Sequence, residues 1–252
     1  VTESPFAKPL IVAIGPRDTD AIVFDAYDHD GNQLSATQDL TSAFGEPMPV
    51  DPTDFRAAFV NTTLGVGGEP RFVTLITTPY NTYVYEPWKD PTVVRLFDMT
   101  ADTQRANSTN VSYWLSRVHG TIVAEHQERV YWAGFRRDSQ AVFTSALDAN
   151  QNAVATALLS NTRSILGLGP HVVAYSDEFD PGGIQAHHFF AVSDHEVITG
   201  LRSMQGALVV FTDRSIYLLT GATDDEFALH RVVTGTGCIS PSSVVEVSGV
   251  LY

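Results

Sequence analysis

Short apolar runs recur along the whole chain, and Gly, Pro, Asn and Asp residues separate them. Runs of four to eight residues with turn residues at both ends are typical of β-strands rather than helices. In the N-terminal region the clearest runs are residues 10–14, 21–27, 71–77, 82–85 and 92–97. We therefore predict a β-rich N-terminal region over residues 1–110.

One segment of this region has the start signal of a helix instead. Asp51 is a good N-cap residue, and Pro52 suits the first helical position because its missing N–H is not needed there. This pattern predicts a short helix over residues 55–59.

The C-terminal half has a sharper pattern. Residues 120–124 and 129–134 predict a hairpin, and further strands are predicted at 171–175, 186–192, 207–211, 215–219 and 227–233. Within 215–219, alternation places Ile216 and Leu218 on one face.

The strongest strand starts recur along this half at intervals of roughly 40 residues, the length of one propeller blade. They lie near Arg129, Pro170, Gly206 and Gly249. Such blades stack radially, because a single four-stranded sheet cannot bury both of its faces. We predict propeller-like blades over residues 111–252, continuing beyond residue 252. A β-sandwich or barrel with irregular spacing is the alternative.

Composition agrees with an all-β fold class. The 252 residues are 44% hydrophobic and include 18 Gly and 13 Pro, which suits a turn-rich β protein with a full core. No apolar run approaches the ~18 residues of a membrane span, so no membrane contact is predicted. The chain starts with Val1 and ends in a strand-like run, from which we expect an excerpt of a longer polypeptide.

Charge limits the partners. Acidic residues outnumber basic ones by 29 to 15, which gives a formal net charge of −14. General nucleic-acid binding is disfavoured because phosphates would be repelled. A negative lumen would still let DNA slide past without sticking, so passing contact with DNA stays open.

No sharp catalytic, cofactor or metal motif is found. Cys238 is the single cysteine, and a buried apolar role suits it better than a nucleophilic one. Asp28, Asp30 and Gly31 resemble the start of a calcium loop, but Thr37 stands where the pattern needs Glu, so a hairpin turn is predicted. His187 and His188 are adjacent in a predicted strand and would point to opposite faces, which disfavours a shared metal. We predict a non-enzymatic protein without a cofactor.

Two acidic clusters keep a hydrolase as a minor alternative. They are Asp177-Glu178 and Asp224-Asp225-Glu226, and a glycosidase needs two carboxylates on opposite sides of a sugar bond. Asp-box repeats, WD dipeptide repeats and kelch double-glycine repeats are all absent from the sequence.

A resemblance enters with the last 56 residues. The phrases Val197–Gly221, Gly235–Pro241 and Val247–Tyr252 are similar to the propeller segment of bacteriophage tail and neck proteins, including the tail-nozzle type. Earlier phrases at Glu128–Gly134 and Tyr175–Pro181 are similar to blade phrases of the same family. The resemblance covers about residues 118–252, and residues 1–117 do not contribute to it.

The resemblance implies a structural subunit of the virion, located in the tail or neck. Its partners would be other virion proteins and copies of itself in a symmetric ring. Aromatic residues are common interface anchors, and four of them cluster in turn-rich sequence between residues 80 and 88. The candidate interface residues are Tyr80, Tyr83, Tyr85 and Trp88, which would equally suit the core.

A second function is a carbohydrate-binding or receptor-binding module of a tail. Such modules present aromatic platforms beside carboxylates, and Tyr113, Trp114 and Trp132 are the candidates for this role. The third and least favoured function is a propeller glycoside hydrolase.

Overall fold

The computed structural model describes residues 11–17, 22–28, 30–40, 55–64, 70–97, 113–115, 120–135, 139–140, 143–145, 167–184, 188–193, 195–239, 244–247 and 250–251. These residues form an all-β fold of antiparallel sheets, with one short 3-10 turn, η5 (Asp224–Glu226). No helix among them is long and apolar enough to cross a membrane. The predicted all-β class is therefore confirmed.

Three four-stranded sheets form the body of the described structure, and in each the strands pair in chain order. Sheet I contains β4 (Ala58–Leu64), β5 (Arg71–Thr77), β6 (Thr82–Tyr85) and β7 (Val94–Leu96). Sheet II contains β9 (Ile122–His126), β10 (Arg129–Ala133), β14 (Val172–Tyr175) and β15 (Phe189–Ala191). Sheet III contains β16 (Ile198–Met204), β17 (Ala207–Thr212), β18 (Ser215–Thr220) and β19 (Ala228–Thr234).

Smaller pairings surround these sheets. The N-terminal sheet has three strands, and each of the other pairings has two. Their strands are β1 (Ile11–Pro16), β2 (Ile22–Tyr27), β3 (Gln38–Asp39), β8 (Tyr113–Leu115), β11 (Ser139–Gln140), β12 (Phe143–Ser145), β13 (Gly167–Leu168), β20 (Glu246–Val247) and β21 (Val250–Leu251).

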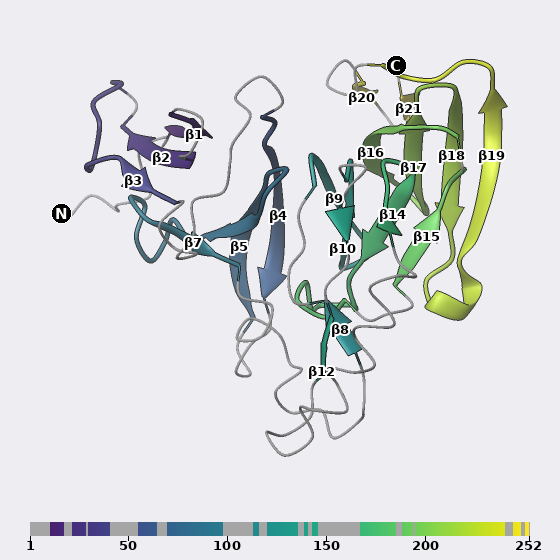
Figure 1. Ribbon diagram of the computed structural model, residues 1–252, viewed down its shortest axis with the longest axis horizontal. Helices are drawn as coiled ribbons and strands as arrows, with labels where there is room; N and C mark the ends of the chain where they lie inside the picture. Colours follow the sequence, from purple (N-terminus) through teal and green to yellow (C-terminus); the bar gives the residue numbers. More distant parts are fainter. Residues whose placement is uncertain are drawn as a thin grey trace.

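The sheets follow one another along the long axis, in the order N-terminal sheet, sheet I, sheet II, sheet III (Figure 1). Strand β10 shows why sheet II must be covered on both sides, since all five of its residues are buried. Val130 and Trp132 point into the core shared with sheet I, whereas Tyr131 and Ala133 point into the core shared with sheet III. We call these two contacts the first joint and the second joint.

The other face of sheet I packs on the N-terminal sheet. Ile76, Tyr83 and Tyr85 lie there against Ile22 and Phe24. Burial alternates along β2, as expected for a strand with one face on a core and one face toward solvent.

A repeated hydrogen bond ties each sheet to the chain that enters the next one. The backbone N–H of the entering segment donates to a carbonyl at the end of the second strand of the preceding sheet or in the connection to its third strand. The three bonds join Gly120 N to Thr78 O (3.0 Å), Ile198 N to Pro170 O (2.8 Å), and Cys238 N to Thr212 O (2.9 Å). The same connection therefore recurs after every four strands.

Two sequence predictions are corrected here. Arg129 and Pro170 do not start successive units, because β10 and β14 are neighbours in sheet II. The predicted helix over 55–59 is wrong, since β4 begins at Ala58 and Phe59 pairs with Ile76; Asp51 and Pro52 lie outside the described residues.

Other predictions are confirmed. The hairpin of β9 and β10 turns at Gln127-Glu128, where both residues have positive φ as a tight two-residue turn requires. Ile216 and Leu218 share the face of β18 that does not contact sheet II. The division at residue 110 and the continuation beyond residue 252 stay predictions.

Candidate functional site

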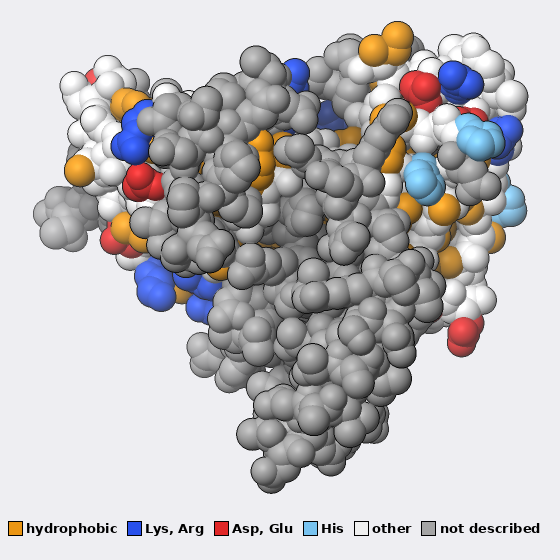
Figure 2. Space-filling model, in the orientation of Figure 1, with side chains coloured by type: hydrophobic (Ala, Val, Ile, Leu, Met, Phe, Trp, Pro, Cys, Tyr) orange, Lys and Arg blue, Asp and Glu red, His pale blue; other side chains and the backbone are white. Residues whose placement is uncertain are grey.

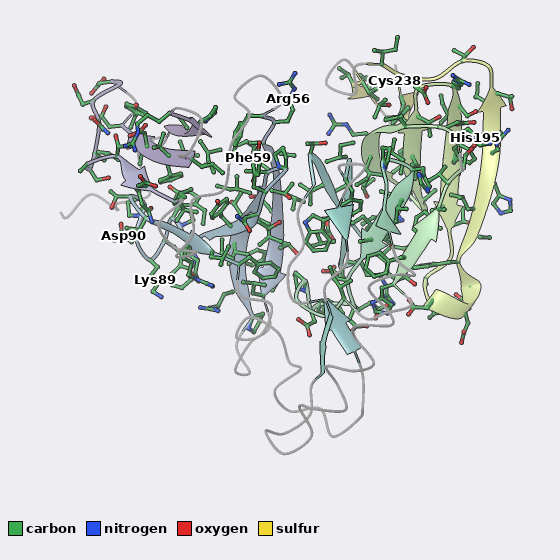
Figure 3. All side chains as sticks on the ribbon, in the orientation of Figure 1. Arg56, Phe59, Lys89, Asp90, His195 and Cys238 are labelled. Atoms are coloured by element: carbon green, nitrogen blue, oxygen red, sulfur yellow. The ribbon has the colours of Figure 1, made fainter. Side chains whose placement is uncertain are left out.

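The first strands of the three sheets lie beside one groove. Two adjoining hollows of about 540 Å³ and 630 Å³ run along it, and both are lined by Phe59 of β4, Val123 of β9 and Leu201 of β16. Arg56 and Phe59 mark its sheet I wall in Figure 3. Val244 and Leu251, from the β20–β21 segment, line the same groove. Three sheets thus present the same edge, that of the first strand, to a common space.

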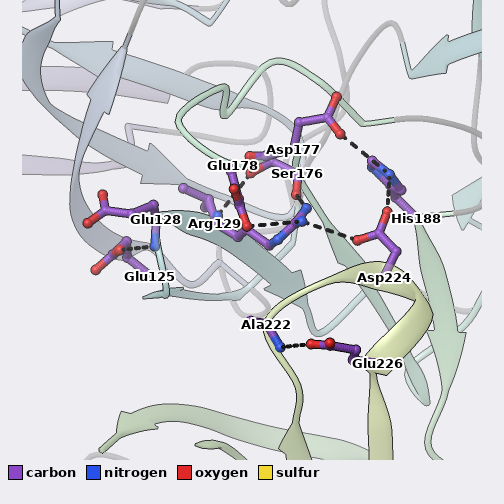
Figure 4. Close-up of polar contacts among 11 residues, drawn as sticks. Glu125, Glu128, Arg129, Ser176, Asp177, Glu178, His188, Ala222, Asp224 and Glu226 are labelled. Carbon is purple, nitrogen blue, oxygen red and sulfur yellow. Dashed lines mark hydrogen bonds and ion pairs between the residues drawn. The ribbon is translucent and has the colours of Figure 1, made fainter. Parts of the chain in front are cut away.

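The second joint contains a charged cluster in which partly exposed carboxylates surround a buried arginine and a buried histidine (Figure 4). The Arg129 side chain is only 8% exposed and sits at the start of β10. Its Nη2 lies 3.3 Å from Asp224 Oδ1 and 3.5 Å from Glu178 Oε1, and its Nη1 donates to the carbonyl of Ser176 at 2.9 Å. Because Asp224 belongs to the β18–β19 connection, the guanidinium bridges sheets II and III.

His188 extends this cluster. It is fully buried, with Nε2 3.2 Å from Asp224 Oδ2 and 3.6 Å from Asp177 Oδ1. Its ring stacks on Tyr175 at 4.7 Å, and Phe227 meets Tyr175 edge-on at 5.2 Å. Burial, assisted by the nearby Asp224 carboxylate, raises the pKa of Tyr175 to about 12, so its phenol stays neutral at physiological pH.

The structure brings together the two acidic clusters that the sequence suggested for a hydrolase. Arg129 Nη2 contacts both Glu178 and Asp224, so a guanidinium fills the space between these carboxylates. Their geometry fits a charged clamp between sheets. The sequence did not indicate Arg129 or His188 as partners, since both contacts depend on sheet packing.

A polar contact also crosses the second joint beside the groove. His126 of β9 and Ser203 of β16 are hydrogen-bonded, with Nδ1 and Oγ 2.9 Å apart. His126 is buried, and burial lowers its pKa, which favours the neutral ring.

The four candidate interface aromatics take different places. Tyr83 and Tyr85 belong to the core between sheet I and the N-terminal sheet, and Tyr80 is partly buried against the same cluster. Trp88 is 44% exposed, which leaves it available for contacts. Among the candidate platform residues, Trp132 is fully buried, and the side chains of Tyr113 and Trp114 lie outside the described residues.

The residues that the sequence suggested for metal binding or nucleophilic chemistry lie in turns and strand connections, or outside the described residues. The Asp28 carboxylate accepts the N–H groups of Asp30 and Asn32, which confirms a turn at this position. Cys238 is partly buried and provides the backbone N–H of the third inter-sheet bond. His187 lies outside the described residues. Among those that are described, no group of three or more metal-ligand side chains is placed to hold an ion.

Comparison with known proteins gives little further information. No family model and no curated protein matches the chain. Among solved structures, the chain is similar to Hsv2 of Kluyveromyces lactis, with 10% identity and a TM-score of 0.20 over 86% of this chain and 76% of that one. A TM-score of this size does not establish a shared fold.

Proposed function

We propose that the chain is a non-enzymatic structural subunit of a bacteriophage tail or neck, similar to a tail nozzle, whose sheets I to III are blades of a β-propeller. The observation that carries the propeller is the edge alignment: β4, β9 and β16 line one groove while the sheets stack face to face. Blades around a central axis have this arrangement, because each first strand lies innermost.

The repeated inter-sheet bond supports the same proposal. Cys238 makes the bond that Gly120 and Ile198 make at the earlier sheets, and we therefore assign β20 and β21 to the first two strands of a further blade. Val244 and Leu251 accordingly lie against the outer apolar face of sheet III, beside Phe211 and Leu218.

The virion role is supported by the phrases between Val197 and Tyr252 and by the apolar cores that join sheets I, II and III. A subunit of this kind works through its shape and interfaces, and its proposed partners are neighbouring virion proteins and copies of itself. DNA passing through an assembled ring would make only transient contact, given the net charge of −14.

The experiment that tests this role is electron microscopy of phage particles with an antibody raised against the chain. We expect label at the tail or neck, together with the chain in mass spectra of purified particles. Absence of the chain from every particle preparation, with a stable free protein in the lysate, would contradict the proposal.

A carbohydrate-binding or receptor-binding module is the second candidate. The exposed Trp88 favours it, because a flat indole is a good platform for a sugar ring. Glycan-array binding that disappears in Trp88→Ala would support this candidate over a purely structural role.

A further inference from the structure

An aromatic and basic surface lies at the end of sheet I. Phe72 is on the same face of β5 as Ile76, but the N-terminal sheet covers only Ile76, and Phe72 is 78% exposed. Trp88 lies next to it, because its Nε1 donates to the carbonyl of Phe72 at 2.9 Å. At this end of sheet I, Phe72 and Trp88 therefore form an exposed aromatic pair that the N-terminal sheet does not cover.

Basic side chains surround this pair. Arg71 and Arg95 both contact the buried Glu86, at 3.1 Å and 3.4 Å, and Lys89 is exposed on the same turn as Trp88. Figure 2 shows Lys and Arg side chains gathered at this lower-left end, where Figure 3 places Lys89. We call Arg71, Phe72, Trp88, Lys89 and Arg95 the basic patch.

An acidic surface lies beside the charged clamp of the second joint, where η5 connects β18 to β19. Glu178 contacts Arg129, and Figure 4 shows Glu128 and Glu226 on neighbouring turns. Asp225 and Glu226 are exposed on η5, and Figure 2 shows a small acidic spot at the lower right. We call Glu128, Glu178, Phe179, Asp225 and Glu226 the acidic patch.

Phe179 gives this patch an apolar centre. It is 54% exposed and has φ of 55°, a conformation that costs a bulky residue free energy. Its N–H donates to the carbonyl of Glu128 at 2.9 Å, which fixes it beside the carboxylates. Each patch thus combines an exposed aromatic side chain with a surplus of one charge. Glu86 and the exposed Asp90 offset part of the positive charge of the basic patch, and Arg129 offsets part of the negative charge of the acidic patch.

We infer that the basic patch of one copy binds the acidic patch of a second copy, head to tail. The charges are complementary, and an aromatic centre on each side supplies the apolar contact that interface cores use. A contact between two different surfaces of one molecule is heterologous, and repeated contacts of this kind give closed rings or filaments. A second copy is favoured over nucleic acid because the chain as a whole carries a net charge of −14.

This inference rests on the proposed function, because it names the interface of the ring. The test uses the full 252-residue chain and sedimentation velocity. The basic-patch variant carries Phe72→Ser and Lys89→Glu. The acidic-patch variant carries Phe179→Asn and Glu226→Lys, where Asn tolerates the positive φ. The control variant carries Val232→Ser and Arg214→Glu, at exposed positions outside both patches.

We expect the wild type and the control to self-associate with the same affinity. Each patch variant should raise the dissociation constant at least tenfold. A mixture of the two patch variants should form one-to-one dimers, because each retains one intact patch. Higher salt should weaken these complexes, since the charges are exposed.

Patch variants that assemble like the wild type would overturn the inference, as would a mixture that stays monomeric. Circular dichroism checks the fold of each variant, and the single substitutions Lys89→Glu and Glu226→Lys replace the double variants if a double variant unfolds. If the chain is present in phage particles but neither patch variant changes its self-association, the proposed interface is wrong and the proposed virion role is unaffected.

Discussion

The two joints on either side of sheet II are held together differently. The first joint has an apolar core, with Trp132 and Val130 packed on Leu75 and Val84 of sheet I, and backbone hydrogen bonds of Gly120 at its margin. The second joint has a comparable apolar core around Tyr131 and adds the Arg129 clamp and the His126–Ser203 contact. Apolar burial is non-directional, whereas an ion pair or hydrogen bond needs fixed geometry. The second joint is therefore expected to set the orientation of sheet III more strictly than the first joint sets that of sheet I.

The largest effect is expected from removing the central side chain of the first joint. Trp132 is fully buried, so Trp132→Ala removes a large apolar contact and leaves a cavity. It should lower the free energy of unfolding by about 3–5 kcal/mol, measured by urea denaturation. An exposed aromatic gives the control: Phe72→Ala should stay within about 0.5 kcal/mol of the wild type. Equal losses in both variants would show that the first joint is not a packed core.

Breaking the clamp of the second joint should have the next largest effect. Arg129→Met removes the buried bond to the Ser176 carbonyl and the contacts with the partly exposed Glu178 and Asp224, so a loss of about 2–3 kcal/mol is expected. A double-mutant cycle with Asp224→Asn should give a coupling energy of about 1–2 kcal/mol. The exposed Arg214 beside Asp213 is the matched control, with about 0.5 kcal/mol or less for Arg214→Met. A coupling energy near zero would mean that the clamp does not join the sheets.

The inter-sheet bonds can be tested at a glycine. A Cβ at Gly120 would lie 2.4 Å from the carbonyl oxygen of Ala133, so the chain entering sheet II would have to shift. Gly120→Ala should cost about 1–3 kcal/mol. Gly15→Ala places a Cβ with no atom within 4 Å and should be neutral or slightly stabilising. Hydrogen exchange would show whether the loss is localised to the Gly120 connection, and wild-type stability of Gly120→Ala would contradict the close packing of Gly120 on Ala133.

The smallest effect is a pH dependence of the second joint. Burial lowers the folded pKa of His126 below its unfolded value of about 6.5, so the unfolded chain binds the proton more readily. The stability that the neutral ring contributes is complete above this value and is lost as pH falls through the folded pKa. His126→Asn should reduce the stability difference between pH 7.5 and pH 5.5. The exposed His195→Asn should leave that difference unchanged, and an equal change in both variants would contradict the assignment.

Much of the strand pattern could be predicted from the sequence. The predicted ranges 71–77 and 82–85 coincide with β5 and β6. The sequence marks both ends, because a proline follows two residues after each run, at Pro79 and Pro87. The interval between Arg129 and Pro170 was wrongly predicted to be the length of one blade. The chain from residue 134 to residue 171 connects two neighbouring strands of one sheet. A one-dimensional interval cannot distinguish strand-to-strand distance from sheet-to-sheet distance.

The candidate site was less predictable. Tyr83 and Trp88 are close in sequence and both aromatic, yet one is 1% exposed and the other 44%. The difference arises because the N-terminal sheet covers β6 but not the turn after it. The ion pairs of Arg129 could not be predicted from the sequence either, because its partners Glu178 and Asp224 are 49 and 95 residues away along the chain.

The sequence by itself determined the all-β class, most strands and their hairpins, because these depend on local alternation, β-propensity and turn residues. Only the tertiary structure decided which strands share a sheet and which aromatics are exposed. It also decided that the carboxylates of Asp177, Glu178 and Asp224 meet a buried arginine and histidine. Those outcomes depend on which faces the sheets bury against each other, and burial between segments far apart in the chain leaves no local pattern.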